Sequence, residues 1–313
     1  MQKLTRIALI AALAATGFGC NQQPAGTAPT ASAPAAVVAP AASPDAAVAA
    51  AVKALRDNNL AGLFAASLPP GEYAKLKADW NKDINSEPVS DEDRKQFTET
   101  MTKLTAPGAE DKMFAEIKPQ LDEMDKQAAQ IPMMIAMGQG FAQSAIQQNK
   151  DLTDAQKTQI SQLLDATAKW AQTTKFTDPA LVKAAIAVVC KTARDLNLKS
   201  VDEARALSYE QGMQKAGIVL GGVKQVLAVY GLNMDKALDS VKVETVSANA
   251  DAAKVKISYT AFDTPFSTES DLVRVDGKWY GKDAIDKWKK HSQEIAGGTP
   301  AATTAQAPAE TAK

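Results

Sequence analysis

The chain has 313 residues, of which 45% are hydrophobic and only 5% aromatic, and its formal net charge is -1. A charge this close to zero gives no electrostatic basis for binding nucleic acid or an anionic lipid surface. The single histidine, His291, and the two cysteines, Cys20 and Cys190, exclude metal sites and acid–base pairs that need two or more histidines. No metal or cofactor site is predicted.

Residues 1–19 have the pattern of a cleavable export signal. A basic start precedes an apolar stretch at residues 7–15, which is too short to span a bilayer, and small residues follow. The next motif, Gly17-Phe18-Gly19-Cys20, resembles the lipobox of bacterial lipoproteins, although Gly17 stands where Leu, Val or Ile is usual. The resemblance implies that Cys20 is the acylated first residue of the mature chain, with palmitate among its acyl groups. Cys20 would then anchor the protein to a membrane.

The residue after the cysteine bears on the location. In enteric bacteria, Asp at this place resembles an inner-membrane retention signal, so Asn21 favours the outer membrane, with the protein facing the periplasm. The alternative is an ordinary secretory signal followed by a chance cysteine. If Cys20 is acylated, Cys190 has no partner within the chain for a disulfide.

Two terminal segments have compositions that do not fold. Residues 20–44 contain little besides Ala, Pro, Thr, Ser, Gln and Gly, and residues 297–313 are similar. Proline stiffens such a segment, so we expect the first to act as a tether between the lipid and a folded domain.

Residues 45–238 have the hydrophobic period of helices, with capping residues at the expected starts. Thr153 and Gln156 form a capping-box pattern, and Asp178 precedes a proline at the first helical position. The predicted N-caps in this region are Asp45, Asn59, Ser90, Thr153, Asp178 and Ser200.

Residues 239–296 change to the period of strands and then return to helix. Val255, Ile257 and Tyr259 alternate with polar residues, and Asp276-Gly277 predicts a two-residue hairpin turn. Asp283 is the predicted cap of a final helix. The predicted fold class is α+β, with a mostly α-helical body followed by a four-stranded antiparallel meander and that helix. A sheet this small is marginal alone, so its apolar face is expected to pack on the helices.

The first helices and last strands carry a resemblance. Residues 51–63 and the ending Val-Asp-Gly-Lys-Trp-Tyr at 275–280 resemble the ketosteroid-isomerase-like cone fold. The resemblance implies a fold only, with the helical residues between the two segments as a large insertion. It transfers no catalytic residue, because a fold does not fix a function.

Two stretches, Ile131–Ala142 and Ala216–Tyr230, are unusually apolar and contain glycines. The simpler interpretation makes them the two central helices, with glycines at close contacts. The alternative is a pocket for a small apolar ligand between these helices. The residues that would line this pocket are Met133, Met137, Phe141, Gly217 and Gly221.

Other candidate groups have simple structural interpretations. Cys190 lies on an apolar helical stripe and is expected to be buried and unreactive rather than a nucleophile. The methionines at 133–137 are expected to fill a core, although thioethers also bind Cu(I). His291 is expected at the surface. The acid pairs at 91/93, 202/203 and 269/271 are expected to be caps or solvated faces.

Three functions remain open. The sequence favours a non-enzymatic cell-envelope lipoprotein that binds another, unknown envelope protein or supports assembly. The first alternative is a carrier or sensor of a small apolar ligand held between the helices, and the second is a hydrolase that uses carboxylates. A protein-binding function requires an exposed apolar patch. A carrier requires an apolar cavity, and a hydrolase requires a cleft of acids with shifted pKa values.

Overall fold

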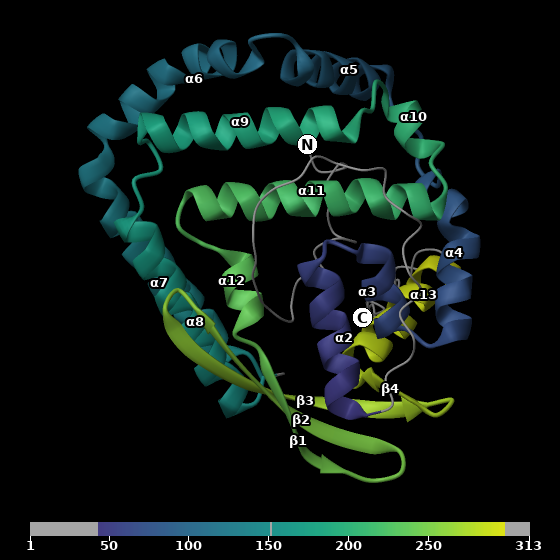
Figure 1. Cartoon of the computed structure of the whole chain (residues 1–313). Helices are drawn as coiled ribbons and strands as arrows, with labels where there is room; N and C mark the ends of the chain where they lie inside the picture. Colours follow the sequence, from purple (N-terminus) through teal and green to yellow (C-terminus); the bar gives the residue numbers. More distant parts are fainter. Residues whose placement is uncertain (1–42, 151, 298–313) are drawn as a thin grey trace, which may run out of the picture.

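The computed structural model describes residues 43–150 and 152–297 of the chain (Figure 1). The predicted signal segment, Cys20, nearly all of the predicted tether and nearly all of the predicted tail lie outside these residues. The described part is mostly helical, with an antiparallel sheet near its C-terminal end and one helix after the sheet, which confirms the predicted fold class.

Most of the helices precede the sheet. They are α2 (Pro44–Arg56), α3 (Leu60–Ser67), α4 (Pro70–Ile84), α5 (Asp91–Thr105), α6 (Ala109–Lys126), the short 3-10 helix η1 (Ala128–Gln130), α7 (Ile131–Gln148), α8 (Asp154–Thr173), α9 (Pro179–Leu196), α10 (Val201–Arg205), α11 (Tyr209–Val229) and α12 (Met234–Asp239). The strands are β1 (Lys242–Ala248), β2 (Ala252–Ala261), β3 (Thr264–Val275) and β4 (Lys278–Gly281), and α13 (Lys282–Gly297) follows them.

The helices form an arc around the inner elements (Figure 1). In this view α5 and α6 run across the top, α7 and α8 descend on the left, and α4 and α13 lie on the right. Helix α9 packs on α5, α6 and α11, and α11 also packs on α3. The pair α7 and α8 packs mainly on itself and reaches the sheet through α8 and β3.

The sheet is a simple meander with strand order β1-β2-β3-β4. The turn between β3 and β4 has positive φ at both central residues, 50° at Asp276 and 78° at Gly277, as the predicted hairpin turn requires. The pairing of β1 with β2 shifts register between Thr245 and Ser247, which marks a bulge in the first strand.

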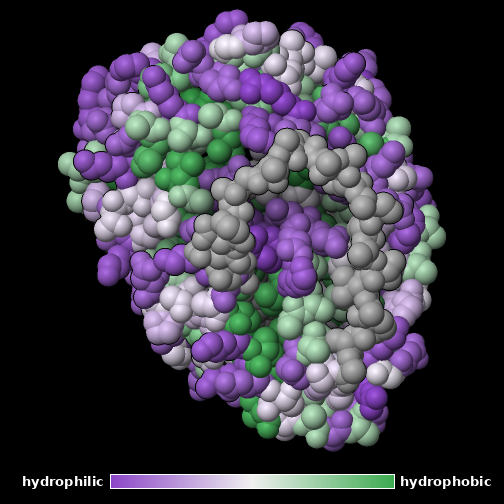
Figure 2. Space-filling view, in the orientation of Figure 1, coloured by the Kyte–Doolittle hydropathy of each residue, from purple (hydrophilic) through white to green (hydrophobic). Residues whose placement is uncertain are grey.

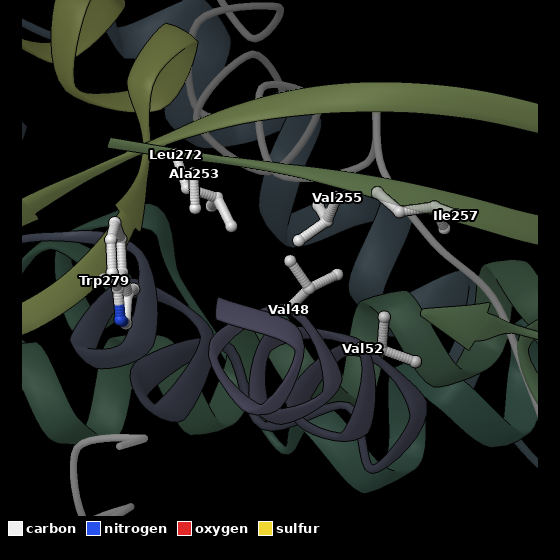
Figure 3. Close-up of a cluster of buried hydrophobic side chains, with 7 residues drawn as sticks. All are labelled: Val48, Val52, Ala253, Val255, Ile257, Leu272 and Trp279. Carbon is white, nitrogen blue, oxygen red and sulfur yellow. The ribbon is translucent and has the colours of Figure 1, made fainter. Parts of the chain in front are cut away.

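One face of the sheet packs on α2. Figure 3 shows Val255 and Ile257 of β2 opposite Val48 and Val52 of α2, with Trp279 of β4 at the end of the row. Val255 and Ile257 are fully buried. The prediction that the apolar face of the sheet packs on the helices is therefore confirmed.

The opposite face of the sheet is covered at one end by α13, which contacts β3 and β4. Tyr280 of β4 and Ile285 of α13 are both buried. Trp288 of α13 donates its indole N–H to Glu72 Oε2 of α4 at 3.0 Å. The final helix therefore connects the sheet to the N-terminal helices.

Aromatic rings join α3, α4 and α11 in a second core. Tyr209, at the start of α11, meets Tyr73 and Trp80 edge to face, with centroids 5.8 and 5.6 Å away. Trp80 donates its indole N–H to the carbonyl oxygen of Leu207 at 3.0 Å. Burial raises the pKa of the Tyr209 phenol, so this side chain stays neutral.

A third core lies between α6 and α9, with Cys190 at its centre. Cys190 is fully buried, and Ala109, Val182 and Ile186 are buried around it. The Sγ atom of Cys190 lies 3.7 Å from Sδ of Met113. Burial raises the pKa of the thiol, which disfavours the reactive thiolate. The prediction that Cys190 is buried is confirmed.

Most predicted N-caps are also confirmed. Backbone N–H groups of the first turn donate to the side chains of Asn59, Ser90, Thr153, Asp178 and Ser200. The predictions for Asp45 and Asp283 are wrong. Helix α2 begins at Pro44, whose fixed φ suits the first helical position, and α13 begins at Lys282, so each aspartate lies within the first turn.

Candidate functional site

Helix α7 has one face turned toward α8. Ile131, Ile135, Gln139 and Gln143 recur every four residues and are half-buried. Gln139 Nε2 donates to Asp165 Oδ1 at 2.7 Å, and Gln143 Nε2 donates to Ser161 Oγ at 2.9 Å. These contacts fix which side of α7 is covered.

The opposite face of α7 carries large apolar side chains in solvent. Met133, Met137 and Phe141 each lie two positions from the covered series, and two residues turn a helix by about 200°. They are 74%, 60% and 72% exposed, and Met134 beside them is exposed as well. We call these four residues the outward face of α7. Exposed apolar side chains scattered singly are ordinary, but four on one helix face mark a candidate interaction site.

The outward face lies within an uncharged segment. The sequence has no Asp, Glu, Lys or Arg between Lys126 and Lys150. This composition suggested that Ile131–Ala142 forms a central helix and that its methionines fill a core, and both predictions are wrong. Apolar residues occur on both sides of α7, but only α8 packs on it closely, so one of its two apolar faces remains in solvent.

Gly217 and Gly221 lie on a different surface, where α11 meets the turn between α2 and α3. A Cβ atom at position 217 would collide with the carbonyl oxygen of Asn58, and one at 221 would lie 3.1 Å from Asn58 Nδ2. These glycines admit the backbone at Asn58, which has a φ of 55°. The predicted close approach at these glycines is confirmed, but the chain that approaches α11 is the turn at Asn58 and not a helix.

The predicted apolar pocket is therefore not formed by its proposed residues. Met133, Met137 and Phe141 point away from α8 into solvent, whereas Gly217 and Gly221 face Asn58. The space that the glycines leave is filled by backbone and by an amide side chain. The three α7 residues therefore lie together on one surface and the two α11 glycines on another, and the two surfaces do not meet.

Sequence reasoning missed a buried lysine on α11. Lys224 is only 4% exposed, and its Nζ donates to the carbonyl oxygens of Leu55 at 2.8 Å and Arg56 at 3.1 Å. Its Nζ also lies 2.9 Å from Asp235 Oδ1. Lys224 therefore caps the C-terminal end of α2, where carbonyl groups lack helical partners. The available signal was a single cation within the apolar stretch 216–230.

Two hollows flank Arg56 at this end of α2. One, of about 390 Å³, lies between α2, α12 and β1, and Asp45, Lys53 and Arg56 are among its lining residues. The other, of about 260 Å³, is lined by residues that include Lys224 and Asp235. Both are partly open and carry charged groups, so neither is the enclosed apolar cavity that a carrier of apolar ligands needs.

The acid pairs have structural partners. The Arg94 guanidinium binds Asp202 (Nε to Oδ2, 2.9 Å) and holds the pKa of that carboxyl below its usual value. Lys254 lies 3.4 Å from Glu269 and 3.2 Å from Asp271. In the pair at 91/93, Asp93 donates its backbone N–H to Ser90 Oγ at the start of α5. These contacts confirm caps and solvated ion pairs.

Metal ligands and membrane spans give no further candidate within residues 43–297. The described side chains include no group of three or more His, Cys, Asp or Glu residues placed to hold a metal ion. His291 falls within α13. No described helix is both long and apolar enough to cross a bilayer.

The surface in the orientation of Figure 1 is mixed. Figure 2 shows mostly hydrophilic or intermediate residues along the upper rim, where α5 and α6 lie, and hydrophobic residues in smaller areas nearer the middle. Comparison of the chain with protein-family models, with curated proteins and with solved structures found no match.

Proposed function

We propose that the chain is a non-enzymatic lipoprotein of the cell envelope that binds another protein through the outward face of α7. The observation that carries this proposal is the exposure of Met133, Met137 and Phe141 on one uncharged helix face. Water contact with such side chains is unfavourable by about 25 cal/mol for each Å² of apolar surface. A protein partner that covers the face would recover this free energy.

The anchoring part of the proposal rests on the sequence. Gly17-Phe18-Gly19-Cys20 supplies the acylation motif, and the segment up to residue 44 supplies a proline-containing tether. We place the protein at the outer membrane, facing the periplasm, because Asn21 lacks the acidic character of the retention signal. A bound partner would then be held close to the membrane surface.

The two alternatives have less support in the described residues. A carrier needs an enclosed apolar cavity, and the two hollows at Arg56 are partly open and charged. A hydrolase needs acids free to exchange protons with a substrate, and the acid pairs are held in caps and ion pairs. The protein-binding function explains an observation that these alternatives leave unexplained, the apolar face of α7.

The anchor is tested by replacing Cys20 with serine. We expect wild-type protein in the membrane fraction and the Cys20→Ser protein in the soluble fraction of the envelope, because a hydroxyl group does not receive the thioether-linked diacylglycerol. A Cys20→Ser protein that remains in the membrane fraction to the wild-type extent would contradict the anchoring proposal.

The binding surface is tested with a photo-activated cross-linking residue at position 137 in intact cells. We expect a protein adduct from this position and none from position 256, an exposed residue on the polar side of β2 that serves as the matched control. Equal protein adducts from both positions, or none from position 137, would contradict binding through α7.

A further inference from the structure

We propose that the protein bound by the outward face of α7 is a second copy of the same chain, and that the two helices pack antiparallel about a two-fold axis at Met137. This inference rests on the proposed protein-binding function. It adds the identity of the partner and the geometry of the contact.

The absence of charge on α7 favours a second copy as the partner. The segment between Lys126 and Lys150 has no charged residue, so α7 offers no ion pair to a partner with a charged surface. A charged partner would lose solvation of its own groups without compensation. The face therefore selects an apolar, uncharged surface. Among the large exposed apolar side chains of the described residues, α7 holds the largest group on one element.

The spacing of the exposed side chains suits a two-fold contact. Met133 and Phe141 each lie four residues from Met137, one on either side. When two such helices pack antiparallel, Met137 meets Met137 of the other copy, and Met133 meets Phe141. The same patch then serves on both copies, as a closed two-fold dimer requires. Flexible methionine side chains can adjust to the phenylalanine ring that they meet.

The area of the outward face and the tether together set the expected strength of the dimer. Helix α7 has 18 residues and is about 27 Å long, so one helix pair covers less than the about 800 Å² per partner of a standard interface. We expect a weak dimer in solution. Tethers of at most about 80 Å, from Cys20 to Ser43, would raise the local concentration of the copies on one membrane.

The geometry is tested by oxidative cross-linking of the full-length, lipidated protein in its own membrane. We expect Met137→Cys to give a disulfide-linked dimer, because position 137 lies on the proposed axis. The matched control is Met124→Cys on α6, which replaces another exposed methionine outside the outward face. Equal dimer yields from the two variants, or no dimer from Met137→Cys, would overturn the proposal.

The antiparallel arrangement is tested by a mixture of two variants. Met133→Cys and Phe141→Cys are expected to cross-link several-fold more when both are present in one cell than when each is present alone. A parallel pair would instead give dimers of each variant by itself and would overturn the stated geometry. Both positions are exposed, so unchanged circular dichroism is expected and shows that the variants fold.

The photo-cross-linking residue at position 137 separates this inference from the function on which it rests. An adduct of twice the mass of the chain, made only of its own peptides, supports the second copy. An adduct with a different protein overturns self-association and leaves protein binding through α7 intact. Adducts with lipid alone overturn both.

Discussion

The sheet with α2 and the hairpin of α7 with α8 use similar side chains with opposite results. In the first region, apolar residues of α2, β2, β3 and β4 meet in one cluster, and Val255 and Ile257 are fully buried. In the second region, no residue of α7 is buried, although its stretch Ile131–Ala142 is unusually apolar. The number of elements that meet, rather than the hydrophobicity of one element, decides what is buried.

The comparison also separates two uses of polar groups. At the end of α2, the buried Lys224 binds backbone carbonyl oxygens and Asp235, so the charge helps to hold α2 against α11. Between α7 and α8, the amide of Gln139 binds Asp165 at the exposed surface, and the amide of Gln143 binds the buried Ser161. The inner region depends on its polar contacts because water cannot replace them.

The largest expected effect is a cavity in the sheet core. Ile257→Ala should lower the free energy of unfolding by about 3–4 kcal/mol, because a fully buried isoleucine leaves unfilled space. Ile135→Ala, on the covered side of α7, should cost about 1 kcal/mol because the site is half-buried and water can enter. Urea denaturation of the soluble Cys20→Ser form measures both. Equal losses would show that the two regions do not differ as described.

A smaller effect is expected from the buried cation. Lys224→Met should lower the free energy of unfolding by about 2 kcal/mol, because the carbonyl oxygens of Leu55 and Arg56 lose a donor where water has little access. The control is Lys256→Met on the exposed side of β2, which should change stability by less than about 0.5 kcal/mol. A Lys224→Met protein as stable as the control would show that the contacts contribute nothing net.

The two regions should respond with opposite sign to the same glycine substitution. Gly217→Ala should destabilise by about 1–3 kcal/mol, because its methyl group collides with the backbone of Asn58. Gly140→Ala, on α7, should stabilise by up to about 1 kcal/mol, because open space surrounds that position and alanine favours helix. Thermal unfolding of both variants gives the signs. Destabilisation by Gly140→Ala would indicate a close contact on α7.

The smallest expected effect concerns the ion pair that joins α5 to α10. Arg94 lowers the pKa of Asp202, so the folded state binds a proton less readily than the unfolded chain. The stabilisation is present above the unfolded pKa, near 4, and is lost as pH falls through the folded pKa. Asp202→Asn should therefore be slightly less stable than wild type at pH 7, and the difference should vanish at acid pH once the Asp202 carboxyl of the folded protein is protonated. A difference that persists there would point to another contact of Asp202.

Local patterns along the chain were readable from the sequence. Two helix starts and one turn depend only on residues close together in sequence, and the structure has all three. They are the capping box of Thr153 with Gln156, the N-cap Asp178 before a proline, and the hairpin turn at Asp276-Gly277. The alternation of Val255 and Ile257 likewise marked the inner face of the sheet.

The positions of whole elements were not readable in the same way. Helix α7 has apolar residues on both sides, so its sequence could not say which side another helix would cover. Lys224 resembled an interruption in an apolar stretch because its acceptors lie far away in sequence, at the end of α2. The candidate site follows from the contacts that α7 lacks, and a sequence pattern does not show these.

The bulge between Thr245 and Ser247 has a consequence for encounters between copies of the chain. β1 is one edge of the sheet, and unpaired edges invite a strand from a neighbouring molecule. The bulge interrupts the flat ladder, exposed Lys242 and Glu244 place charges along it, and β4, at the other edge, has only four residues. These features hinder two copies of the chain from pairing edge to edge into a continuous sheet.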